Sequence, residues 1–348
     1  MEFRSYLVRR LLLVVPVLIG VSILIFGLFQ FFPAHQRAML YVSDPRQLAN
    51  IDEIIELYGL NAPIWQQYFT WLGQVFHGNL GWSKVVGLPV TDAIFTFLPA
   101  TLELAIFATP IIIIGGIWLG TKAAAHKNGT IDHVTRAAAI IGWSLPTFWF
   151  GLVLLMIFYG FFSGFLPPER LSTEMSVLVH SASFTRYTNI NFLDGILNWE
   201  WRVTLDSLRH MVLPVVTLSV VNIAFIMRLM RSSMLESLGK GYILTARAKG
   251  LPERMVVNKH ARRNAMIPVL TVSGYLFAAI VNGVVVTESI FNYKGLGWWA
   301  WRTAVTLDAS SILGFALFNG ILFVLTNLVV DLLYARFDPR VRLGGSIS

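Results

Sequence analysis

The stretch Gly241-Tyr-Ile-Leu-Thr-Ala-Arg-Ala-Lys-Gly250-Leu-Pro-Glu-Arg254 is polar and basic, and it lies between long apolar segments of the chain. Gly250 suits the left-handed residue that ends a helix, and Pro252 suits the first turn of the next helix. Glu253 then lies near the positive N-terminal end of that second helix. The stretch therefore predicts two short helices joined by a tight elbow, which is typical of a docking element for a soluble partner. A solvated basic loop is the alternative.

The composition around this stretch is that of a polytopic membrane protein. Apolar residues make up 55% of the chain, charged residues only 13%, and the mean hydropathy is +0.65. A helix needs roughly 20 residues to cross the hydrocarbon core of a bilayer. The segments that meet this requirement are Leu11–Phe32, Leu98–Leu119, Ala138–Phe162, Met211–Met230, Val269–Val286 and Ile312–Tyr334. We therefore predict an all-α integral membrane protein with six transmembrane helices, in which residues 1–348 form one membrane domain.

The distribution of the basic residues predicts the orientation of the chain. If both termini lie on one side of the membrane, that side carries 18 of the 27 lysines and arginines, including nine between Arg228 and Arg263. Basic residues are enriched in cytoplasmic loops, so we expect both termini in the cytoplasm. This asymmetry explains the net charge of +8 without nucleic-acid binding, which we do not expect. The absence of cysteine excludes disulfide bonds and cysteine-based metal sites.

Three of the connections between spans are long. Residues 33–97 and residues 163–210 are predicted to be extracytoplasmic, and residues 231–268 form a cytoplasmic loop that contains the opening stretch. Within the first segment, Leu48–Tyr58 and Ile64–Val75 have the apolar spacing of short amphipathic helices.

Further motifs follow one another along the chain. Two of them are Leu98-Pro-Ala-Thr-Leu-Glu-Leu104 and Gly142-Trp-Ser-Leu-Pro-Thr-Phe-Trp149. The others are Tyr58–Tyr68, Gly78–Ser83, His210–Pro214, Arg231–Met234, Arg262–Ala265, Gly283–Glu288 and Asp338–Arg340. In order and spacing, the set resembles the permease subunits of ATP-binding-cassette (ABC) importers, in the class that serves dipeptides, oligopeptides and nickel. The resemblance covers nearly the whole chain and implies the type I importer permease fold.

The resemblance also assigns a role to the opening stretch. It corresponds to the EAA loop of these permeases, which seats in a groove of the ATPase subunit. The implied contact residues are Thr245, Ala246, Arg247, Ala248, Lys249, Gly250, Leu251, Pro252 and Glu253. The chain departs from the family pattern in lacking the leading glutamate of this element. It also has Asn79 where aspartate is frequent and Lys294 where proline is usual.

The same resemblance implies the partners of the chain. They are a second, similar permease subunit, two cytoplasmic ATPase subunits and an extracytoplasmic solute-binding protein, in the plasma (inner) membrane of a prokaryote. The chain has no Gly-x-x-x-x-Gly-Lys-Ser/Thr loop, so we expect ATP and Mg to be used by the partner subunits. We expect no cofactor, no metal and no catalytic residue on this chain.

Other functional classes fit the sequence less well. An intramembrane protease or lipid-modifying enzyme needs a Ser/His or paired-carboxylate site, whereas Glu103 and Asp331 are predicted near opposite sides of the membrane. A channel or a proton-coupled carrier needs a ring or chain of charged groups within the membrane, and the predicted spans contain neither.

Polar residues within the spans are candidates for a translocation path, because such residues usually face the bundle interior or a cavity. These candidates are Glu103, Asn222, Asn282 and Asn319, with Asn327 as a further one. Hydrogen bonding between helices is the alternative for each asparagine. Dipeptides or oligopeptides are the expected cargo. Oligosaccharides and nickel stay open, because related permeases serve them and the binding protein sets most of the selectivity.

Overall fold

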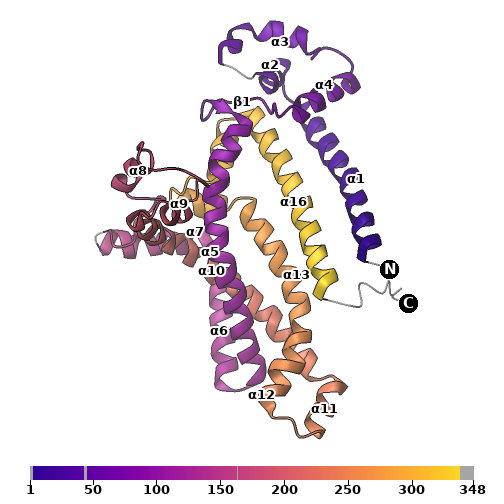
Figure 1. The fold of residues 1–348 in the computed structure, drawn as a ribbon, viewed down its shortest axis with the longest axis vertical. Helices are drawn as coiled ribbons and strands as arrows, with labels where there is room; N and C mark the ends of the chain where they lie inside the picture. Colours follow the sequence, from indigo (N-terminus) through magenta and orange to yellow (C-terminus); the bar gives the residue numbers. More distant parts are fainter. Residues whose placement is uncertain (1–2, 43–44, 163, 338–348) are drawn as a thin grey trace.

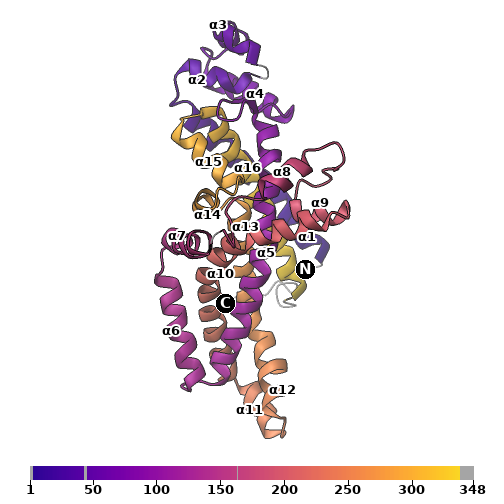
Figure 2. The same ribbon diagram turned by 90° about the vertical axis from the view of Figure 1, so that its left-hand side faces the viewer.

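The computed structural model describes residues 3–42, 45–162 and 164–337, so the motif Asp338–Arg340 lies outside the described residues. These residues form a bundle of long helices with shorter helices at both ends and along one side (Figures 1 and 2). The long helices are α1 (Phe3–Phe29), α5 (Val90–Ala125), α10 (Trp201–Leu238), α13 (Arg262–Val281) and α16 (Ala309–Phe337). Within the described ranges, five helices are long and apolar enough to span a bilayer, and a bent pair of helices makes a sixth span if it is counted as one.

The third predicted span is bent. One span over Ala138–Phe162 with a kink at Pro146 is expected, and the structure has α6 (Thr130–Ser144) and α7 (Thr147–Leu155), which meet at 93°. Leu145 between them is extended, because the proline that follows it disfavours the helical conformation. Helix α7 continues into the π-helical turn η3 (Met156–Phe161). The kink expected at Pro146 is present, and it is large enough to divide the span into two helices.

Close packing of α5 against α10 forms the centre of the bundle. Gly116 and Gly120 lie one turn apart on α5 and face α10. A Cβ atom on Gly116 would lie 2.5 Å from Ile226 Cγ2, and one on Gly120 would lie 2.6 Å from the Met227 carbonyl oxygen. These two glycines therefore allow the helix backbones to approach each other closely.

Several helices extend beyond the apolar segments that predict them. Helix α5 begins at Val90, before the apolar span that starts at Leu98, as Pro89-Val90 predicts. Helix α10 begins at Trp201, so the last part of the 163–210 segment is helical. At the other end of the chain, α12 (Glu253–Met255) and the π-helical turn η4 (Val256–Ala261) lead directly into α13. The second short helix predicted for the elbow is therefore the start of one long helix, Glu253–Val281.

The segment before α5 forms a small helical cap at the top of Figure 1. It contains α2 (Ala34–Ala38), η1 (Met39–Tyr41), η2 (Pro45–Asn50), α3 (Ile51–Leu57), α4 (Ile64–Phe76) and the hairpin of β1 (Trp82–Ser83) and β2 (Leu88–Pro89). Helices α3 and α4 match the two amphipathic helices predicted there, whereas the short hairpin is not predicted. Asp308 Oδ2 holds this hairpin to the start of α16, because it accepts hydrogen bonds from Ser83 Oγ at 3.1 Å and Lys84 N at 2.9 Å.

The remaining helices are short. Helices α8 (Thr173–Val179) and α9 (Asn191–Leu197) lie beside α5, and α14 (Val285–Ile290) and α15 (Leu296–Val305) connect α13 to α16 (Figure 2). Helix α11 (Gly241–Ala248) lies at the end of the molecule opposite to α2, α3 and α4.

Candidate functional site

The elbow predicted from the sequence is a helix C-cap at the tip of the molecule (Figure 1). Helix α11 ends at Ala248, and Gly250, just after its C-cap Lys249, has a φ of +71°. Gly250 N donates to the Arg247 carbonyl at 2.9 Å, and Leu251 N donates to the Ala246 carbonyl at 3.4 Å. This pair of bonds is the Schellman motif, in which a left-handed residue satisfies the last carbonyls of a helix. The conformation predicted for Gly250 is confirmed.

Contacts on its inner side fix the elbow to the bundle. Ser237 Oγ, in the last turn of α10, donates to the Ala261 carbonyl at 3.0 Å and lies 2.5 Å from Tyr242 Oη. Ile243 of α11 and Val256 of the following helix are fully buried in the main hydrophobic core. Helices α10, α11 and α13 therefore meet in one packed junction.

The outer side of the elbow is exposed. Of the nine residues predicted to contact a partner, Ala246 is buried and Leu251 is half-buried, and the other seven are exposed. Leu244, which is 64% exposed, and Tyr242 and Met255 add apolar surface beside them. These three side chains are not among the contact residues predicted from the sequence. For Leu244, the signal that could have identified it is an apolar residue at a solvent-facing helix position.

An ion pair closes the turn at Gly250. Arg247 Nη2 lies 2.6 Å from Glu253 Oε1, and Arg247 Nε lies 3.1 Å from Oε2, so the contact is bidentate. The hydrogen bonds to Glu253 raise the pKa of Arg247. Both side chains are largely exposed, so the pair contributes only about 0.2–1 kcal/mol. Its main effect is to fix the path of the chain between α11 and α12.

A buried ion pair ties α6 to α10 above the elbow. Arg231 Nε and Nη2 bind Asp132 Oδ1 and Oδ2 at 2.6 Å and 2.8 Å, and Asn128 N donates to Asp132 Oδ2 at 3.0 Å. The Asp132 side chain is fully buried. This pair gives a structural role to the arginine of the Arg231–Met234 motif. Arg231 connects α10, the helix that leads into α11, to the turn between α5 and α6.

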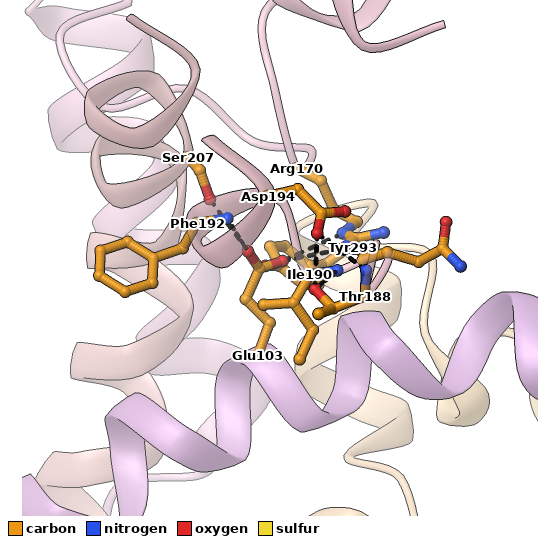
Figure 3. Close-up of polar contacts among 9 residues, drawn as sticks. Glu103, Arg170, Thr188, Ile190, Phe192, Asp194, Ser207 and Tyr293 are labelled. Atoms are coloured by element: carbon orange, nitrogen blue, oxygen red, sulfur yellow. Dashed lines mark hydrogen bonds and ion pairs between the residues drawn. The ribbon is translucent and has the colours of Figure 1, made fainter. Parts of the chain in front are cut away.

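A second buried carboxylate, Glu103, organises the opposite half of the bundle (Figure 3). Glu103 Oε2 accepts hydrogen bonds from Arg170 Nη2 at 2.8 Å and Tyr293 Oη at 2.7 Å. Its Oε1 accepts from Ser207 Oγ at 3.0 Å and Phe192 N at 2.9 Å. The carboxylate thus joins α5, α10, the segment that carries α8 and α9, and the turn between α14 and α15.

The groups around Glu103 are shielded from water. Burial opposes the charge of Arg170, but Glu103 and Tyr293 together outweigh burial and raise the pKa of this arginine. Burial and then the same carboxylate raise the pKa of Tyr293 well above its ordinary value. Beside this cluster, Asp194 Oδ1 accepts from Thr188 N and Oγ1 at 2.8 Å and orders the loop before α9 (Figure 3).

Glu288 is a third buried carboxylate, and it lies in a part of the fold where glycines allow close approach. Its oxygens accept hydrogen bonds from Thr101 Oγ1 and Trp298 N, each at 2.8 Å. A Cβ atom on Gly295 would lie 2.6 Å from Glu288 Cδ, and one on Gly283 would lie 2.8 Å from Gly297 N. Only glycine fits such close approaches, so the Gly283–Glu288 and Gly295–Trp298 segments form one compact unit against α5.

The residues predicted to line a path differ in their surroundings. Glu103 is fully buried and hydrogen-bonded, and Asn222 Nδ2 donates to the Leu218 carbonyl of its own helix at 2.7 Å. In contrast, the side-chain oxygens of Asn282, Asn319 and Asn327 are buried and have no hydrogen-bond partner among the described residues. A buried amide oxygen without a partner is rare, so these three are the polar groups still available for another ligand. The role of all of them in a path stays a prediction.

Comparison with known proteins identifies the family. A family described as the binding-protein-dependent transport system inner membrane component matches residues 112–343, and its N-terminal companion matches residues 3–105. The chain belongs to this family. As a binding-protein-dependent transport component, it is the membrane part of a system that works with a binding protein and ATPase subunits, and it is not itself the enzyme.

Curated relatives match along nearly their whole length. A protein of Escherichia coli named a probable D,D-dipeptide transport system permease protein is 37% identical over 99% of both chains. A dipeptide transport system permease protein of the same organism is 35% identical, over 97% of this chain and 98% of its own. An oligopeptide transport system permease protein of Bacillus subtilis is 34% identical, over 97% of this chain and 99% of its own. The resemblance inferred from the motifs is confirmed.

Proposed function

We propose that this chain is a permease subunit of an ATP-driven importer and forms part of a path for dipeptides or oligopeptides. The names of the relatives above support this class of cargo. In the proposed assembly, the chain pairs with a second, similar permease. Two cytoplasmic ATPase subunits use ATP and Mg, and an extracytoplasmic binding protein delivers the cargo. The chain itself forms part of the path and transmits the movement of the ATPase subunits to the membrane helices.

The observation that carries the proposal is the exposed elbow at the start of the long helix Glu253–Val281. An ATPase subunit seated on Thr245–Glu253 would push directly on this helix, because the helix runs without a break from Glu253 into the span. It would also push on α10, because Ser237 holds α10 to the elbow. ATP binding would thus be converted into a movement of α10 and α13 relative to the other spans, which is a rigid-body transition of the kind known in domain closure.

The proposed orientation places α11 and both termini in the cytoplasm. The nine basic residues between Arg228 and Arg263 surround the elbow, and such residues favour the cytoplasmic side. The cap of α2, α3 and α4 and the segment with α8 and α9 then face the binding protein. The chain would lie in the plasma (inner) membrane of a prokaryote.

The proposed path uses the asparagines whose oxygens have no partner. Asn282 at the end of α13 and Asn319 in α16 offer amide groups to a peptide backbone or to water. Asn222 and Glu103 are already hydrogen-bonded in this conformation, so they would have to exchange partners to meet cargo. In this proposal, Glu103 has mainly a structural role, because its hydrogen bonds join α5, α10 and the segments around α9 and α14.

The experiment is a solute screen on the reconstituted complex with its binding protein, in which ATP hydrolysis is measured. We expect dipeptides or oligopeptides to stimulate hydrolysis. Stimulation by oligosaccharides or by nickel, but by no peptide, would contradict the proposed cargo and leave the coupling role intact. The purified chain alone should not hydrolyse ATP, so hydrolysis by the isolated subunit would contradict the proposal as a whole.

A further inference from the structure

Helix α4 (Ile64–Phe76) has an apolar stripe that the described part of the chain leaves uncovered. The stripe consists of Trp65, Phe69, Leu72 and Phe76, whose spacing of four, three and four residues places them on one face of a helix. Trp65, Phe69 and Phe76 are 66%, 64% and 81% exposed, whereas Leu72 is half-buried. Three large aromatic side chains in one exposed row need a partner, because burying an aromatic side chain is strongly favourable.

The other side of α4 is held against a membrane span. Tyr68 Oη lies 2.8 Å from Ser22 Oγ of α1, and the Tyr68 and Trp71 rings lie 5.3 Å and 5.5 Å from the ring of Phe26. Ser22 precedes the end of α1 at Phe29 by about 10 Å, at a rise of 1.5 Å per residue. Helix α4 therefore lies beside the last turns of α1, near the end of its apolar segment Leu11–Phe29 (Figure 1).

Helix α4 differs from the neighbouring α3 in charge. Helix α4 has no charged residue, whereas the neighbouring α3 carries Asp52, Glu53 and Glu56, all exposed. Leu24 and Leu28 of α1 and the following Phe31 are exposed as well. Helix α1 packs against α16 at the edge of the bundle (Figure 1).

We propose that α4 is an interfacial helix, whose aromatic stripe lies at the boundary between headgroups and acyl chains of the lipid bilayer. Tryptophan and other aromatic residues are enriched at this depth, and amphipathic helices lie there with their apolar face toward the acyl chains. The position of the stripe beside the last turns of a span, on a helix without charged residues, favours lipid as the occupant. Such a helix fixes the depth of the cap and the tilt of α1. The inference depends on membrane insertion of α1 and not on the direction or cargo of transport.

The absence of native cysteine makes the test direct. A nitroxide label is attached to Phe69→Cys in the complete transporter, in nanodiscs of phosphatidylethanolamine and phosphatidylglycerol. Its accessibility to oxygen, which concentrates in lipid, is compared with that to a water-soluble nickel chelate. Leu28→Cys on α1 is the lipid control, and Asp52→Cys on α3 is the water control. We expect the oxygen-to-nickel ratio at position 69 to be several-fold higher than at position 52 and close to that at position 28.

Two results would overturn the proposal. A label at position 69 that is as accessible to nickel as position 52 would mean that the stripe is in water. A label that neither reagent reaches would mean that a protein covers α4. Trp65→Cys and Phe76→Cys repeat the measurement on the same stripe, so that a variant that fails to assemble does not leave the proposal undecided.

Discussion

Replacement of Gly250 tests whether the shape of the elbow is required for coupling. Gly250 has φ of +71°, and a Cβ atom there would have no heavy atom within 4 Å. The cost of Gly250→Ala is therefore the left-handed backbone alone, about 1–2 kcal/mol. A cost of this size lowers the population of the native elbow about 5- to 30-fold, and the affinity of the ATPase subunits falls with that population. Asparagine tolerates the left-handed region, so Gly250→Asn should reduce the affinity of the ATPase subunits less than Gly250→Ala does, and Gly250→Val should reduce it more.

The measurement is titration of the purified ATPase subunits onto the reconstituted permease pair, together with peptide uptake. Gly241→Ala is the matched control, because Gly241 lies in the same elbow, also has open space around its Cβ position, and is not among the glycines with positive φ. Gly241→Ala should leave both affinity and uptake unchanged. Equal losses for Gly241→Ala and Gly250→Ala, or no loss for Gly250→Val, would refute the reasoning from backbone conformation.

Two further variants test the packing of the bundle. Glu103→Gln leaves the buried Arg170 without its counter-charge, and loss of such a partner costs about 3–5 kcal/mol, so the unfolding temperature in detergent should fall clearly while the exposed control Glu53→Gln has no effect. An unchanged unfolding temperature would mean that the Glu103 network is not a structural anchor. Gly116→Ala forces a methyl group into α10 and should cost about 1–3 kcal/mol, whereas Gly20→Ala, with nothing within 4 Å, should be neutral in the same thermal assay.

The sequence predicts the helical class and most of the spans, because apolar length is a local property. It predicts α3 and α4 from their amphipathic spacing and the left-handed Gly250 from its place between two helical stretches. The sequence also predicts a kink at Pro146, but it does not predict that the two helices meet at 93°. Helix ends are predicted less well, since polar residues such as those after Trp201 continue a helix outside the apolar window.

The buried carboxylate sites depend on contacts between distant parts of the chain. Glu103 meets Arg170 across 67 residues and Tyr293 across 190 residues, and no local pattern relates these positions. A charged residue in a predicted span indicates that the residue faces a polar partner or a cavity. The sequence alone does not show whether such a residue lines a path or holds loops in place. The pair of Asp132 and Arg231 is likewise separated by 99 residues and is visible only in the folded chain.

Cross-linking at the elbow tests the central claim most directly. Lys249 lies exposed at the tip of the elbow, so Lys249→Cys is the only thiol in an otherwise cysteine-free chain. In membranes that contain the complete transporter, a short thiol cross-linker should join this cysteine to an ATPase subunit, and an impermeant thiol reagent should not reach it from outside intact cells. His77→Cys, exposed in the cap, should give the reverse pattern. Labelling of Lys249→Cys from outside, or its failure to cross-link where His77→Cys succeeds, would contradict the account.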